Sequence, residues 1–116
     1  MLRIGSIVWG VKNLPAGIDF WRDALDYKLL REASAEEAIL IPRNGVGPQL
    51  ILKKVTSSTA RRHHMDLHTL EQPAEVARLQ GLGATEVDWV YEADADYVVL
   101  ADPDGNRFCV VQHQVG

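Results

Sequence analysis

The sequence has a single cysteine, no long apolar run and no excess of basic residues. Cys109 alone cannot form a disulfide within the chain, and so low a cysteine content suits a reducing cytoplasm. The longest charge-free stretches, 44–52 and 108–116, hold nine residues each, whereas a membrane helix needs roughly twenty. Asp and Glu number 16 against 12 Lys and Arg, so the chain lacks the basic surplus that nucleic-acid binding requires. We therefore expect a cytoplasmic protein without a membrane or nucleic-acid partner.

The rest of the composition is that of an ordinary globular domain. Hydrophobic residues make up 47% of the 116 residues and charged residues 24%, which excludes disordered and fibrous classes. The first residues lead directly into a strand-like pattern, so we expect no signal peptide. Length and composition predict one small domain, or two very small halves that share a core.

Charge is unevenly distributed along the chain. Residues 53–64 include four Lys or Arg and no acidic residue, whereas residues 86–104 include seven acidic residues and no Lys or Arg. The basic stretch indicates either a local attraction for an anionic small molecule or a solvated loop between strands.

An internal repeat is the main organisational signal. Residues 58 positions apart share pattern and turn residues, as when Pro15 matches Pro73. Small polar residues at 56–60 mark the midpoint and are typical of a linker. We therefore predict a single domain built from two modules, residues 1–55 and 61–116.

Each module is predicted to contain one strand, one helix and three further strands. Asn13 is suited to cap the first helix, and the second is expected to begin near Pro73 and to stop at Gly83. The strands are expected at 2–11, 28–32, 37–41 and 49–55 in the first module, and at 62–69, 85–91, 96–101 and 107–113 in the second. The fold class is thus α+β, with two tandem βαβββ modules forming a partial β-barrel with the helices outside. The uncovered faces of the two sheets would form a cleft for a small ligand.

The period of two along a strand predicts which side chains face the cleft. Apolar residues such as Leu67 and Val110 are expected on the helix side. The cleft side is then expected to carry the residues Ser6, Val8, Ile51, Lys53, His64, Asp66 and Cys109.

Three stretches carry a family resemblance. They are FWRDAL at 20–25, RHHMDL at 62–67 and DPDGNRF at 102–108. Together with the paired modules, they resemble the vicinal oxygen chelate superfamily, which holds glyoxalase I, bleomycin-resistance proteins and extradiol dioxygenases. The resemblance covers essentially the whole chain, is strongest to the short glyoxalase-like domains, and implies the glyoxalase/bleomycin resistance fold and a homodimer.

The resemblance also implies positions for a divalent metal. Its ligands would come from Ser6, from Lys53 or Ile51, from His64 and from Cys109, where metal-dependent members have His or Gln, Glu, His and Glu. Only His64 matches that pattern. A protonated Lys offers no lone pair and Ser is a weak ligand, so we predict no metal and no other cofactor. A weaker alternative is a metal site formed by His64, Asp66 and Cys109.

Three functions remain open. The first is binding of a small, aromatic or anionic molecule without the usual metal site. Its ligand-binding residues are expected to be Ser6, Val8, Lys53, Arg62, His64, Trp89, Tyr97 and Cys109, with Trp89 and Tyr97 on the sixth and seventh strands. The second is a metal-independent isomerase or lyase, in which His64 transfers a proton and Asp66 orients the imidazole of His64. The third is a metal-dependent lyase or dioxygenase with atypical ligands.

Overall fold

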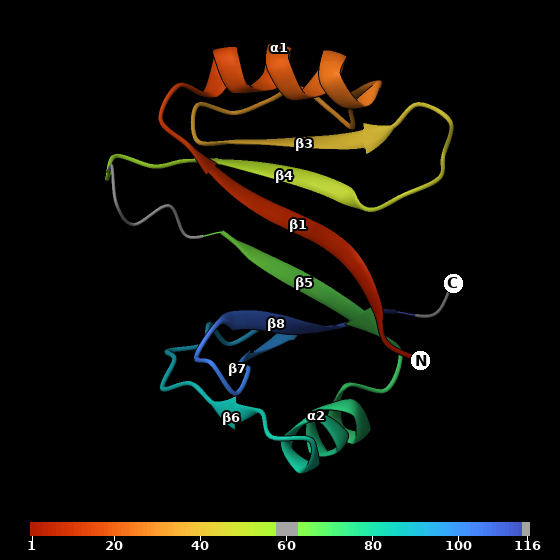
Figure 1. The fold of residues 1–116 in the computed structure, drawn as a ribbon, viewed down its shortest axis with the longest axis vertical. Coiled ribbons are helices and arrows are strands. Elements are labelled where there is room, and N and C mark those ends of the chain that lie inside the picture. The colour runs from red at the N-terminus through yellow and green to blue at the C-terminus, as the bar shows by residue number, and fades with distance from the viewer. Residues whose placement is uncertain (58–62, 115–116) are drawn as a thin grey trace. The chain divides into compact units, whose positions relative to one another are not determined.

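The computed structural model describes residues 1–57 and 63–114. Its elements follow the predicted βαβββ order twice (Figure 1). The first module holds β1 (Arg3–Val11), α1 (Leu14–Leu25), β2 (Tyr27–Leu29), β3 (Glu37–Pro42) and β4 (Gln49–Lys54). The second holds β5 (His64–Thr69), α2 (Gln72–Gly81), β6 (Thr85–Glu86), β7 (Tyr97–Ala101) and β8 (Arg107–Gln112).

The chain forms two compact units. The N-terminal unit is Ser6–His63, and the C-terminal unit is His64–Gly116 together with Met1–Gly5. The strand order is β2-β3-β4-β1 in the first and β5-β8-β7-β6 in the second. In both units the first and last strands of the module pair in parallel, and the remaining pairs are antiparallel.

Strand register confirms the repeat. Val8 of β1 lies opposite Ile51 of β4, and Asp66 of β5 lies opposite Cys109 of β8. Both residues of the second pair are 58 positions after those of the first. Equivalent positions in the two modules therefore have equivalent neighbours across the parallel strand pair.

Helix α1 has the capping predicted for it. The side-chain oxygen of Asn13 accepts the backbone N–H of Ala16 at 3.0 Å, which satisfies one of the free donors of the first turn. Asp26 ends the helix in the left-handed conformation and donates its N–H to the carbonyl of Arg22. Leu14, the first residue of this helix, is buried, whereas Leu25, its last residue, is 43% exposed.

The core of the N-terminal unit lies between α1 and one face of its sheet. Leu14, Leu40, Leu50 and Leu52 form this core with Ala38. Leu40 and Leu52 have no exposed surface. Neighbouring residues of a strand point to opposite faces. Because Leu50 and Leu52 belong to the core, Ile51 and the residues two positions from it along β4 lie on the face without a helix.

The C-terminal unit follows the same plan with a shorter sixth strand. Leu100 and Val110 are fully buried, and α2 contacts β8. The strand expected at 85–91 ends at Glu86, because the hydroxyl of Tyr91 accepts the Val99 N–H at 2.8 Å. The Tyr91 hydroxyl thus accepts the Val99 N–H, which a longer sixth strand would use for pairing. Helix α2 ends at Gly81, two residues before the expected Gly83. No helix in residues 1–57 and 63–114 is long and apolar enough to cross a bilayer.

Candidate functional site

Each sheet has one face covered by a helix and one face that no helix of its own unit covers, which we call the helix-free face. In the N-terminal unit Leu50 and Leu52 of β4 point to α1, so Ile51 and Lys53 lie on the helix-free face. The repeat places Cys109 of β8 at the position of Ile51. On β5, His64 and Asp66 alternate with Met65 and Leu67, so His64 and Asp66 share one face of the strand.

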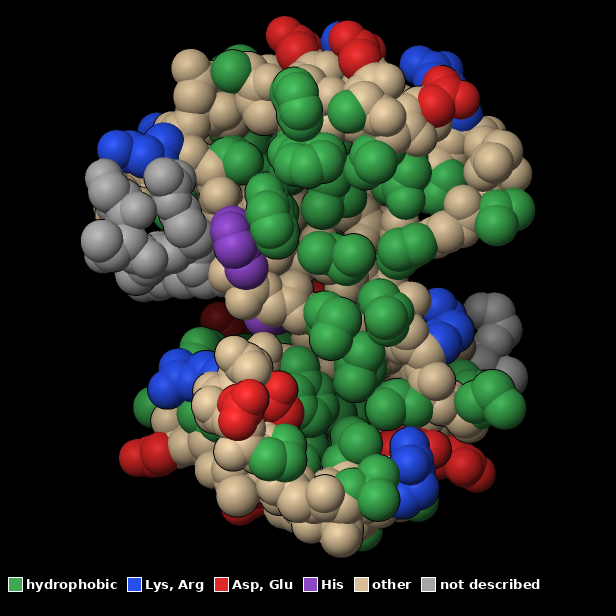
Figure 2. Space-filling view, in the orientation of Figure 1, with side chains coloured by type: hydrophobic (Ala, Val, Ile, Leu, Met, Phe, Trp, Pro, Cys, Tyr) green, Lys and Arg blue, Asp and Glu red, His purple; other side chains and the backbone are tan. Residues whose placement is uncertain are grey.

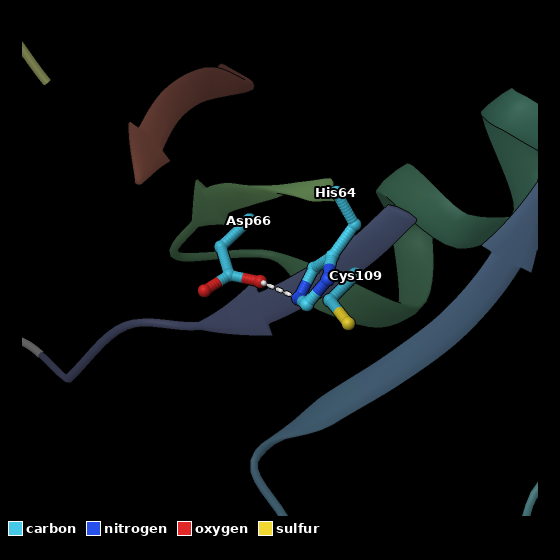
Figure 3. Close-up of side chains that lie close together, drawn as sticks. All are labelled: His64, Asp66 and Cys109. Atoms are coloured by element: carbon cyan, nitrogen blue, oxygen red, sulfur yellow. Dashed lines mark ion pairs between the residues drawn. The ribbon is translucent and has the colours of Figure 1, made fainter. Parts of the chain in front are cut away.

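Three polar side chains meet on the helix-free face of the C-terminal unit (Figure 3). His64 and Asp66 come from β5 and Cys109 from β8, and one ligand-type atom of each lies within 4.8 Å of those of the other two. The Nε2 atom of His64 is 3.5 Å from Oδ1 of Asp66, and their side chains are 31% and 19% exposed. The structure therefore brings together the three residues named as the alternative metal set.

This arrangement allows two kinds of chemistry. An imidazole beside a carboxylate can accept or donate a proton, and the carboxylate can orient the ring. Imidazole, carboxylate and thiolate are also the donor groups that zinc-class metal ions bind. Both uses need the same three side chains.

The predicted site residues of the N-terminal unit have other partners. Ser6 is 2% exposed and donates its hydroxyl to Oε1 of Gln49 at 3.4 Å. Val8 is 3% exposed and lies opposite Ile51. Ser6 therefore contributes a hydrogen bond inside its own sheet, and Val8 contributes apolar packing.

Lys53 is held by a neighbouring carboxylate. Its Nζ lies 2.7 Å from Oε1 of Glu37, which is its cross-strand neighbour on β3. An ammonium paired in this way cannot ligate a metal, and the hydroxyl of Ser6 is a weak ligand. The residues at the family's metal positions in the N-terminal unit therefore do not fit the family's divalent ion.

Aromatic side chains lie on β7 and on the segment before it, and β7 pairs with β8, the strand of Cys109. Tyr97 is on β7, two residues before Val99, and Val99 pairs with Cys109. Trp89 donates its indole N–H to the Tyr97 hydroxyl at 3.3 Å, although it follows β6 and is not on the strand where it was expected. The ring of Tyr91, which was not among the predicted site residues, is 5.6 Å from that of Tyr97.

Hydrophobic side chains reach the surface in both units (Figure 2). Trp89 and Tyr91 are 42% and 40% exposed, so flat rings are available to a ligand in the C-terminal unit. The sequence spacing of Tyr91 and Tyr97 would have identified Tyr91 as a site residue only if the irregular path of residues 87–96 had been known. Arg62 lies outside the described residues.

The other three histidines have structural surroundings. The Nδ1 atom of His68 is buried and has no hydrogen-bond partner among the described residues, and its ring is 4.3 Å from that of His113. Burial, more than the neighbouring His113 and Arg3, lowers the pKa of His68. His63 accepts the Gly10 N–H at 3.0 Å and stacks on a tryptophan ring, which fixes it to its own unit.

The family is decided by a match over most of the chain. Residues 6–111 match the model of the glyoxalase-like domain. The chain belongs to the glyoxalase-like domain family. No curated protein matches it at a significant level.

Solved structures with this fold cover nearly the whole glyoxalase-like chain. A hypothetical protein from Bacillus halodurans C-125 has a TM-score of 0.67 at 16% identity over 99% of this chain and 98% of that one. A Streptomyces coelicolor methylmalonyl-CoA epimerase variant has 0.63 at 20% identity over 94% and 95%. A glyoxalase/bleomycin resistance protein/dioxygenase superfamily member from Vibrio splendidus 12B01 has 0.61 at 15% over 95% and 99%. These likenesses establish the fold.

Proposed function

We propose that this glyoxalase-like protein binds a small molecule with a flat aromatic part and an anionic head. The ligand would lie on the helix-free face of the C-terminal unit. The observation that carries the proposal is the hydrogen bond from Trp89 to Tyr97 at 3.3 Å. It holds an aromatic surface on the sheet that also carries His64 and Asp66.

The spacing of these groups suits a compact ligand. Tyr97 is separated from Asp66 by two strand spacings and two residues along the strand, which places their Cα atoms roughly 12 Å apart. Side chains that extend over the face shorten this gap to the length of one or two fused rings. The rings contribute apolar area, and the imidazole of His64 can donate a hydrogen bond to an anionic head.

Binding is tested with benzoate and 1-naphthoate, and with cyclohexanecarboxylate as the non-planar control. Titrations are followed by calorimetry and by tryptophan fluorescence in the presence of EDTA. We expect the two aromatic acids to bind more tightly than the saturated acid. Tyr97→Leu is expected to weaken them about three- to tenfold, since an aromatic pair contributes roughly 0.5–1.5 kcal/mol beyond its area.

A matched control lies in the other unit. Phe20 of α1 is 62% exposed, so Phe20→Leu removes an exposed aromatic ring far from β7 in sequence and should leave the affinities unchanged. Equal affinity for benzoate and cyclohexanecarboxylate, or equal losses in Tyr97→Leu and Phe20→Leu, would overturn the proposal.

A second candidate is a metal-independent isomerase or lyase. It is favoured by the 3.5 Å approach of His64 to the half-buried Asp66. Because the fold is shared with methylmalonyl-CoA epimerase, the direct test is solvent-deuterium exchange at C2 of methylmalonyl-CoA, followed by NMR with EDTA present. His64→Gln should slow the exchange about 10²–10⁴-fold. Exchange no faster than the buffer blank, or unchanged in the variant, would exclude this candidate.

We also propose that the protein acts in the cytoplasm as a homodimer. The support is the family resemblance together with exposed apolar side chains such as Phe20. Sedimentation velocity at several concentrations tests the dimer. A single monomeric species at every concentration would contradict it.

A further inference from the structure

We propose that His64, Asp66 and Cys109 bind one zinc-class divalent ion through donors of the C-terminal unit alone. All three side chains are half-buried, and their ligand-type atoms lie within 4.8 Å of one another. They come from two neighbouring parallel strands, and Asp66 lies directly opposite Cys109. The site is thus built on sheet, which holds side chains more rigidly than loops do.

The donor set selects the metal. A thiolate and an imidazole favour zinc-class ions, whereas magnesium and calcium take oxygen ligands. Three protein ligands leave a fourth position of a tetrahedral ion open, as in sites that bind water or a substrate oxygen. His64 and Cys109 are two of the positions implied by the family resemblance, but this set adds Asp66 and takes nothing from Ser6 or Lys53.

The distances fit a small adjustment of side chains. Ligands of tetrahedral zinc lie about 2.0–2.3 Å from the ion and hence about 3.6 Å from one another. His64 and Asp66 already approach to 3.5 Å. The remaining separations, at most 4.8 Å, close by roughly 1 Å when the Cys109 side chain rotates, a change that staggered rotamers allow.

The other module provides an internal comparison. The residues 58 positions earlier are Ser6, Val8 and Ile51, which include no imidazole, carboxylate or thiolate. The repeat fold therefore forms without these donors at the equivalent positions. Val8 and Ile51 pair in the same register as Asp66 and Cys109. An apolar side chain such as Val is therefore compatible with the backbone at the position of Asp66.

The test uses the metal alone, without an organic ligand. Protein dialysed against EDTA is titrated anaerobically with Co²⁺, then with Zn²⁺ in competition. We expect one ion per chain and a thiolate-to-cobalt charge-transfer band in the near ultraviolet. Because Cys109 is the only cysteine, such a band can arise from no other residue. Absence of the band, or its survival in Cys109→Ser, would overturn the proposal.

Substitutions locate the remaining ligands. His64→Gln and Asp66→Val should each weaken Zn²⁺ binding at least about 100-fold, since even groups that only support a ligand contribute about 10- to 100-fold. Lys53→Met should leave the affinity unchanged, whereas a site that used this position would respond. Unfolding by urea of the metal-free variants checks that each is folded. An unchanged Zn²⁺ affinity in folded His64→Gln or Asp66→Val would remove that residue from the site and refute the three-ligand proposal.

This inference uses the same face as the proposed ligand but does not depend on it. Zinc binding is measured without carboxylic acids, and benzoate binding is measured with EDTA. A negative result for zinc binding therefore leaves the benzoate proposal unaffected, and the reverse also holds. If both hold, repeating the benzoate titration with one equivalent of Zn²⁺ shows whether the carboxylate takes the fourth position, through a tighter affinity that Cys109→Ser abolishes.

Discussion

The imidazole of His68 lies directly against the backbone of Gly5. A Cβ atom added at Gly5 would lie 2.2 Å from Nδ1 of His68 and 2.3 Å from Cε1. Both residues belong to the C-terminal unit. Glycine at position 5 is therefore required for space, because any side chain there would overlap the ring of the half-buried histidine.

Gly5→Ala should destabilise the protein by about 1–3 kcal/mol, the usual range for overpacking. The free energy of unfolding is measured by urea denaturation. In a His68→Ala background the same substitution should be nearly neutral, because the ring that the methyl group meets is gone. An equal loss in both backgrounds would show that the clash is not with His68.

Gln112 of β8 acts as the missing cap of α2. The residue before this helix, Glu71, makes no side-chain capping bond. Instead Oε1 of Gln112 accepts the Gln72 N–H at 2.8 Å, and its Nε2 donates to the Leu70 carbonyl at 2.8 Å. One side-chain amide thus joins the end of β5, the start of α2 and β8.

Gln112→Leu should lower the free energy of unfolding by about 1–3 kcal/mol, because it leaves partly buried backbone groups without partners. Gln80→Leu is the matched control, since Gln80 is an exposed residue of α2 and should change stability by less than about 0.5 kcal/mol. Thermal and urea unfolding measure both. Similar losses for the two variants would refute the capping role.

Asp26 ends α1 at φ 56° and ψ 48°, the left-handed conformation. A Cβ is unfavourable there, so Asp26→Gly should raise the free energy of unfolding by up to about 1 kcal/mol. The substitution also removes an exposed ion pair with Arg43 at 3.5 Å, which contributes little. Arg43→Gln measures that contribution alone. A loss of stability in Asp26→Gly larger than that in Arg43→Gln would contradict the backbone argument.

The sequence repeat predicted the parallel strand pairs more accurately than the hairpins. An offset of 58 holds for β1 and β4 against β5 and β8, but Leu40 corresponds to Leu100 in the structure. Leu40 pairs with Leu50, and Leu100 pairs with Phe108. The offset is 60 there because the paired residues are ten positions apart in the first hairpin and eight in the second, so the second hairpin is two residues shorter. Such a shift keeps every side chain on its face, so it is invisible in the hydrophobic pattern.

The candidate site was predictable where it depends on strand alternation. The positions of His64, Asp66 and Cys109 followed from the period of two and from the repeat. Trp89 did not follow, because the sixth strand stops when the Tyr91 hydroxyl takes a backbone donor. The pairing of Lys53 with Glu37 was also missed, since it depends on the register of a hairpin. Tertiary hydrogen bonds of this kind leave no periodic signal in sequence.

Asp102 makes the turn before β8 sensitive to acid. Its carboxylate accepts the Asn106 side-chain amide at 3.1 Å, the Asn106 N–H at 2.8 Å and the Asp104 N–H at 3.0 Å. The bond from the Asn106 side chain, followed by that from its backbone, lowers the pKa of Asp102. A carboxyl group whose pKa is lower in the folded state stabilises the protein at pH values above the pKa of the unfolded state, which is about 3.9.

This stabilisation is lost as pH falls from about 5 through the lowered pKa, because the proton then binds the unfolded state first. Asp102→Asn does not titrate, so the difference in unfolding free energy between wild type and Asp102→Asn should narrow as pH falls, measured by urea unfolding at steps between about pH 6 and 3. Asp104→Asn removes one charge from the same turn but none of these three bonds. It should follow the wild-type pH profile, and a profile that instead matched Asp102→Asn would assign the effect to net charge.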